Sequence, residues 1–133
     1  MSIINRFATE DYIENKFPDM QLGVECAVPE KFMGKRVYQA YFKLNTFPSK
    51  GQVSYINSDI FNSIDTVLEL FGTVDKAGLL CGTFSYGGKT LSIGYDKQQY
   101  NGTPIRIFVN NEMDSTYFDA NTSAIIKIKY TKI

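Results

Sequence analysis

The sequence predicts a mainly β protein, an antiparallel β-sandwich of the jelly-roll or Greek-key kind preceded by a short N-terminal helix. Three observations support this fold class. From Lys35 onward, polar and apolar residues alternate with period two, as in strands with one buried face. Turn residues separate these runs at short intervals. Aromatic residues, which favour strands, make up 14% of the chain. About six or seven such strands fit a sandwich.

The N-terminal segment carries the only clear helix signal. Glu10 and Asp11 would lie in a first turn, where the helix dipole favours acidic side chains, and Pro18 ends the run. Ile13 and Phe17 are four residues apart and would share one face. Because a helix of about two turns is marginal alone, it needs a domain or other copies to pack against.

The next segment, residues 18–34, contains two prolines and two glycines. It is expected to form a linker or an irregular arm that can include a short edge strand at Gln21–Val28. Residues 1–34 are therefore interpreted as an arm, and residues 35–133 as one sandwich domain.

The first strands of the sandwich are expected near residues 37–44 and 64–71. Each has an alternating face, formed by Tyr38, Ala40, Phe42 and Leu44 in the first and by Ile64, Thr66, Leu68 and Leu70 in the second. A strand over Leu79–Tyr86 and a returning strand over Lys89–Tyr95 flank Gly87-Gly88, which is a two-residue hairpin signal.

Two further strands complete the predicted sandwich. The turn signal Asn101-Gly102 precedes a strand in which Ile105, Ile107 and Val109 share one face. The last strand has the clearest alternation, with one face formed by Ala124, Ile126, Ile128 and Tyr130 and the other by Lys127, Lys129 and Thr131. This pattern is typical of a half-buried antiparallel strand.

Charge narrows the function classes. The chain has 14 basic and 14 acidic residues, whereas nucleic-acid-binding proteins carry a basic surplus. It has no histidine, which excludes Ser-His-Asp and Cys-His catalysis within this chain.

Charge is divided unevenly along the chain. Residues 1–34 hold six acids and three bases, a net charge of −3, and residues 35–133 hold eight acids and eleven bases, a net charge of +3. This split could orient a partner, or simply form a solvated face.

Targeting and cysteine signals are sparse. The start, MSIINRFATEDYIENKF, has no apolar run of signal-peptide or membrane-span length, so a protein made in a cytoplasm without membrane insertion is expected. Cys26 and Cys81 lack CxxC spacing, and two buried free thiols are favoured over a disulfide.

Two sets of oxygen-bearing residues were candidates for chemistry. One is a loop cluster that could hold Ca²⁺ or form a plain turn, comprising Asn110, Asn111, Glu112 and Asp114. The other could supply an acid and a base if the fold paired two of its members, which are Asp59, Asp65 and Asp75. No spacing rule brings either set together, so no catalytic residue, metal or cofactor is predicted.

The aromatic residues are more informative. Tyrosine combines a large contact area with a hydroxyl group, which suits protein interfaces and sugar faces, although most tyrosines of a β protein fill the core or the sheet surface. Tyr100 and Tyr117 lie in predicted loops among polar residues and are the best candidates for exposed contacts.

Several stretches resemble bacteriophage proteins. NRFATEDYIENKF resembles the short N-terminal segment, of the form ATxxYVxxK, of small tail-fibre and virion proteins. Four further motifs occur in the same order in a β domain common in phage and prophage tail proteins, which this part of the chain resembles. In this sequence they are MGKRVYQAYF, Phe47-Pro48, SIDTVLEL and AIIKIKYTK.

The resemblance implies a non-enzymatic virion structural protein of the fibre type. It could be a tail fibre or receptor-binding tip, or a head fibre or decoration protein, and such modules usually form homotrimers with other phage virion proteins as partners. The attachment or oligomerisation segment would include Asp11, Tyr12, Ile13, Lys16 and Phe17. Tyr100 and Tyr117 would face a host surface glycan or protein. The alternative is a stand-alone carbohydrate-binding β-sandwich.

Overall fold

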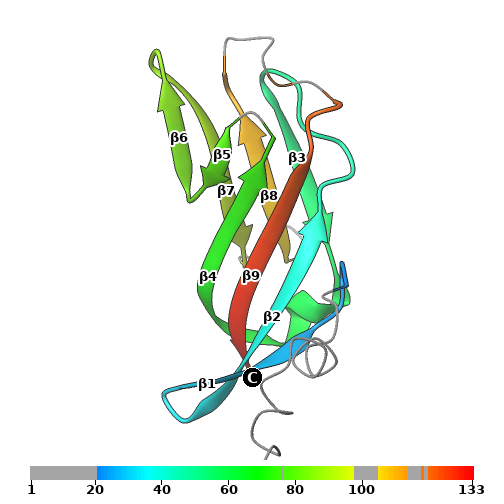
Figure 1. The fold of residues 1–133 in the computed structure, drawn as a ribbon, viewed down its shortest axis with the longest axis vertical. Coiled ribbons are helices and arrows are strands. Elements are labelled where there is room, and N and C mark those ends of the chain that lie inside the picture. The colour runs from blue at the N-terminus through cyan, green and yellow to red at the C-terminus, as the bar shows by residue number, and fades with distance from the viewer. Residues whose placement is uncertain (1–20, 76, 98–104, 114–117, 119) are drawn as a thin grey trace, which may run out of the picture.

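Two antiparallel β-sheets pack face to face in the computed structural model, which describes residues 21–75, 77–97, 105–113, 118 and 120–133 (Figure 1). This architecture confirms the predicted mainly β sandwich. The expected N-terminal helix and the Asn101-Gly102 turn lie outside the described residues. Within the described part of the chain, no helix is long and apolar enough to cross a membrane.

The larger sheet has five strands in the order β1-β2-β9-β4-β5. Their bounds are β1 Cys26–Phe32, β2 Lys35–Lys43, β9 Ala124–Lys132, β4 Ile64–Val74 and β5 Gly78–Leu80. The smaller sheet has four strands in the order β3-β8-β7-β6. Their bounds are β3 Gln52–Asn57, β8 Arg106–Asn111, β7 Lys89–Asp96 and β6 Thr83–Tyr86. A short 3-10 helix, η1 (Asp59–Ser63), leads into β4.

The core lies between the sheets and follows the predicted alternation in β8 and β9. It does not do so in β4, where register shifts bring Val67 to the core with Ile64 and Leu70 while Thr66 is exposed. In β9 the residues at every second position are at most 1% exposed, and these are Ala124, Ile126, Ile128 and Tyr130. The facing sheet contributes Leu91, Ile93, Ile107 and Val109. The period-two pattern therefore identified the buried faces of β8 and β9 correctly.

The single strand expected over Leu79–Tyr86 is wrong. The strand β5 ends at Leu80, and the chain then crosses from the five-stranded sheet to the four-stranded sheet, where it forms β6. Gly82 lies at this crossing with φ +76°, a left-handed conformation that interrupts a strand and favours glycine. The predicted hairpin at Gly87-Gly88 is confirmed, since both glycines have positive φ and join β6 to β7.

The sequence predicts a linker or irregular arm over residues 18–34, but residues 26–32 form β1 and pair with β2. The expected short edge strand therefore exists, although it runs over Cys26–Phe32 rather than Gln21–Val28. The five-stranded sheet thus begins before residue 35.

Both cysteines are free, as expected. The expectation that both thiols are buried is wrong, because Cys26 is half-buried and Cys81 is exposed. Cys81 follows β5 in the connection between the two sheets, outside the core.

Candidate functional site

The site residues expected from the sequence lie outside the described residues, and they are Asp11, Tyr12, Ile13, Lys16, Phe17, Tyr100 and Tyr117. The assignment of these residues to attachment or receptor contact stays a prediction.

The cluster considered for Ca²⁺ is not a single loop, because Asn110 and Asn111 belong to β8, while Asp114 lies outside the described residues. Asn111 has a structural role. This side chain is fully buried, and its Nδ2 donates to the Pro48 carbonyl at 2.9 Å while its Oδ1 accepts from the Met113 N–H at 3.0 Å. Both ends of the amide are therefore engaged with backbone groups. Among the residues that the structure describes, no group of three or more metal-binding side chains is found.

Asp65 and Asp75 are not brought together as an acid and a base. They lie at opposite ends of β4, about 30 Å apart at the usual rise per residue of a strand. Asp65 instead accepts a hydrogen bond from Lys35 Nζ at 2.7 Å, and this lysine holds the pKa of the Asp65 carboxyl below its ordinary value. Asp59 lies in η1.

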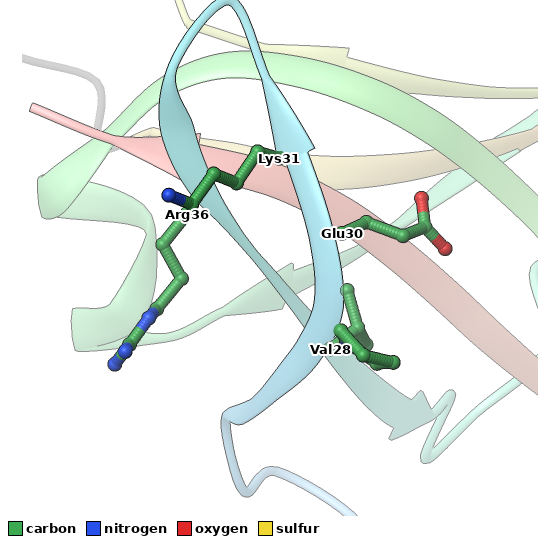
Figure 2. A pocket seen from close by; sticks show the side chains of 5 residues that line it. Val28, Glu30, Lys31 and Arg36 are labelled. Atoms are coloured by element: carbon green, nitrogen blue, oxygen red, sulfur yellow. The ribbon is translucent and has the colours of Figure 1, made fainter.

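A shallow groove lies on the β1–β2 hairpin and encloses about 300 Å³ (Figure 2). We call it the hairpin groove, and it is lined by Val28, Pro29, Glu30, Lys31 and Arg36. At the lower end of the molecule in Figure 1, this hairpin lies beside the C-terminal end of β9.

The groove originates in an irregularity of β1. Val28 pairs with Val37 and Lys31 pairs with Arg36, so the two residues between Val28 and Lys31 have no partner on β2. They form a bulge that bends the strand, and proline is tolerated there because no ladder hydrogen bond needs its missing N–H. Within the bulge, the Glu30 carboxylate lies 2.8 Å from Lys129 Nζ.

Two cations of the hairpin face each other. Lys31 and Arg36 are cross-strand partners, and Figure 2 shows both side chains extending to one side of β1 while Glu30 extends to the other. Both side chains are exposed, and neither side chain makes a hydrogen bond or an ion pair with another described residue. Like charges directly opposite each other in an antiparallel pair are unfavourable.

Most of the other lysines of this sheet are paired, although the exposed Lys43 of β2 has no carboxylate partner among the described residues. Four of them have a carboxylate oxygen within 3.2 Å, in the pairs Lys35–Asp65, Lys127–Glu69, Lys129–Glu30 and Lys132–Glu25. The positive charge of the hairpin groove is therefore left without compensation in the described part of the chain.

The hairpin tip adds exposed apolar surface. Phe32 is 41% exposed and Met33 is 88% exposed. Met33 and Gly34 form the two-residue turn with φ of +49° and +80°, and the left-handed conformation is unfavourable for methionine.

A buried polar contact anchors the start of β1 to the sheet. The Tyr130 hydroxyl, which is inaccessible to solvent, donates to Glu25 at 2.5 Å, and Lys132 Nζ lies 2.6 Å from the other oxygen of this carboxylate. Burial first, and then the Glu25 carboxylate, raises the pKa of Tyr130 strongly, while Glu25 raises the pKa of Lys132. These contacts fix the residue that precedes β1 to the end of β9.

A second surface lies on the outer face of the four-stranded sheet. Tyr55 on β3 and Phe108 on β8 are opposite each other, and we call this pair the aromatic platform. The Arg106 guanidinium lies 3.7 Å from the Tyr55 ring centre, and its Nε is 3.9 Å from an Asp96 oxygen. Tyr55 is 44% exposed, so part of the platform faces solvent.

Neither surface was identified from the sequence. The hairpin groove depends on the bulge in β1, and the platform depends on the pairing of β3 with β8. A glycine inside a strand, Gly94, is the available signal for the platform, since such glycines mark a close approach of another group.

Comparisons with protein-family models, with curated proteins and with solved structures found no match. Two described surfaces bear on function: the hairpin groove and the aromatic platform.

Proposed function

We propose that this chain is a non-enzymatic virion structural protein of the fibre type, which assembles as a homotrimer and attaches through its N-terminal segment. The sequence resemblance to phage fibre and virion proteins suggests this function. The observation that carries it is the hairpin end of the sandwich, where uncompensated charge and exposed apolar side chains occur together.

Exposed apolar residues support an assembly role for this region. At the hairpin end these are Phe32, Met33 and Ile133. Leu22 and Val24 are also exposed, in the segment that enters β1 and lies beside Tyr41. Concentrated apolar exposure marks sites of protein interaction. Closed cyclic symmetry is the rule for homo-oligomers, so copies that meet through such ends form rings.

The acidic groups support the non-enzymatic part of the proposal. Asp65 and Asp75 are far apart, and Glu25, Glu30 and Glu69 are each held by a lysine. These three carboxylates are used in ion pairs that hold neighbouring segments of the sheet to β9.

Light scattering on the full chain tests the proposal. The expected mass is roughly 45 kDa, three times 15.1 kDa. The double variant Phe32→Ser and Met33→Ser should dissociate the oligomer, whereas Leu79→Ser, which removes a 61% exposed leucine from β5, should not. A wild-type chain that is monomeric at every concentration would contradict the proposal. Labelling of intact particles under the electron microscope then locates the protein.

One observation favours a second candidate function, a stand-alone carbohydrate-binding sandwich. The aromatic platform offers ring faces beside the polar groups of Arg106 and Asp96, a combination suited to a sugar ring and its hydroxyls. Titration with a panel of oligosaccharides, followed by NMR, tests this. Binding that is lost in Phe108→Ala and Tyr55→Ala but kept in Phe71→Ala, with a monomeric chain, would favour the second function.

A further inference from the structure

We infer that the hairpin groove is the docking site for the N-terminal segment, residues 1–20, of a neighbouring copy of this chain. The inference rests on the proposed function, because it requires copies of the chain to assemble. It assigns a specific occupant to a groove whose charge is otherwise uncompensated.

The first argument is the pairing of two cations. Lys31 and Arg36 lie opposite each other in the hairpin and extend to the same side (Figure 2). An acidic group placed between them removes their mutual repulsion and gains two charge-assisted hydrogen bonds. The planar guanidinium of Arg36 is suited to holding a carboxylate through two parallel bonds. The groove therefore favours an acidic occupant.

The second argument is charge complementarity within the chain. Residues 1–20 contain four acids and two bases, a net charge of −2, and the remaining 113 residues carry +2. Three of these acids fall within five positions, at Glu10, Asp11 and Glu14. In the helix that the sequence predicts there, Glu10 and Glu14 share one face and present two carboxylates to one partner.

Apolar side chains complement the charges. The segment carries Ile13 and Phe17 at helical spacing, and the groove has Val28 and Pro29 in its lining, with the exposed Phe32 next to it. Contacts between these groups exclude water, which strengthens the ion pairs beside them.

The third argument is where the described chain begins. Leu22 forms a parallel bridge with Tyr41, and the Gly23 N–H donates to the Tyr41 carbonyl at 2.7 Å. Because the bridge is parallel, the chain at Leu22 runs in the same direction as β2. Leu22 lies five residues along β2 from Arg36, about 17 Å at the usual rise of a strand, and a segment of 20 residues is long enough to span that distance to the hairpin groove of a neighbouring copy.

Charge reversal in the full chain tests the occupant. Lys31→Glu with Arg36→Glu should weaken the oligomer at least about tenfold, and so should Glu10→Lys with Asp11→Lys and Glu14→Lys. Combining all five changes in one chain should restore assembly, because every reversed contact is complementary again. Lys43→Glu with Lys89→Glu, which changes the net charge equally at exposed sites elsewhere, should leave assembly intact.

Zero-length carbodiimide cross-linking tests which copy supplies the segment. Mixed unlabelled and ¹⁵N-labelled wild-type chains should give peptides that join Lys31 of one isotope to an acidic residue of the N-terminal segment of the other. Such peptides with both halves of one isotope only would overturn docking between copies. If the wild type is an oligomer without Lys31 cross-links, and the charge-reversal variants still assemble, the inference is overturned and the proposed function stands. A monomeric wild type would contradict both.

Discussion

The Phe108 ring lies directly over Gly94, its cross-strand partner on β7. A Cβ atom at Gly94 would come within 2.3 Å of Phe108 Cζ, closer than any unstrained contact allows. The glycine therefore provides the space that the far end of the Phe108 ring occupies. An aromatic ring covering a strand glycine also shields backbone that would otherwise be open to water.

Gly94→Ala should consequently destabilise the protein by about 1–2 kcal/mol, because the ring must leave its position. In a Phe108→Ala background the same change should cost almost nothing, since the ring is absent. Urea denaturation of the four proteins of this double-mutant cycle measures the difference. Equal costs in the two backgrounds would show that the ring does not occupy this space.

Removing the donor and removing the acceptor of the Tyr130–Glu25 hydrogen bond should have unequal effects on stability. Tyr130→Phe should lower the free energy of unfolding by about 1 kcal/mol, because Glu25 keeps Lys132 as a partner. Glu25→Ala should cost more, about 1–3 kcal/mol, because it leaves the buried Tyr130 hydroxyl without its acceptor. Chemical denaturation provides both values. Glu30→Ala is the control and should change stability little, since its side chain is 55% exposed. The reverse order of the two costs would contradict this account of the contact.

Acid should selectively remove the contribution of the Lys35–Asp65 pair. Lys35 lowers the pKa of Asp65 from its ordinary value of 3.8, so the pair stabilises the folded state above that value. As the pH falls through the lower pKa of the folded state, Asp65 becomes protonated and the stabilisation is lost. The difference in stability between wild type and Asp65→Asn should thus be constant above about pH 5 and shrink below it.

Thermal unfolding across pH 2 to 7 measures this dependence. Lys35→Met should remove it, because the lysine causes the shift. A stability difference that persists unchanged at the lowest pH would show that the pair does not form in solution.

In the dissociated chain, Met33→Asn should stabilise the hairpin by about 0.5–1 kcal/mol. Met33 has φ +49°, and asparagine adopts this left-handed conformation at lower cost. Met33→Leu is the matched control, since leucine meets the same backbone penalty. Differential scanning calorimetry compares the three proteins, and equal melting temperatures for the two variants would contradict the assignment of strain to this residue.

The strands that the sequence predicted well are those with an uninterrupted alternation. In β9, Ile126 and Ile128 are buried while Lys127 and Lys129 lie on the outer face, as expected. By contrast, the edge strand expected at Gln21–Val28 forms over Cys26–Phe32 as β1, and its bounds were misplaced because the bulge and Pro29 disrupt the period-two pattern. The strand β3 is short, and only Ile56 within it is buried, so its signal is weak.

The candidate surfaces could not be predicted because they depend on strand pairing. Lys31 faces Arg36 only because the bulge shifts the register by two residues. Phe108 covers Gly94 only because β7 and β8 pair with one particular register, which no local pattern specifies. Sequence patterns describe which face of a strand is buried, whereas contacts between exposed side chains on different strands require the assembled sheet.

The bulge in β1 has a consequence for how copies can approach one another. β1 is an edge strand of the five-stranded sheet, and a regular, flat edge invites another chain to add to it by backbone pairing. Pro29 has no N–H to offer an incoming strand, and the bend around it prevents a straight strand from following the edge. Copies can therefore be concentrated at their hairpin ends without their sheets fusing into a continuous fibrillar ladder.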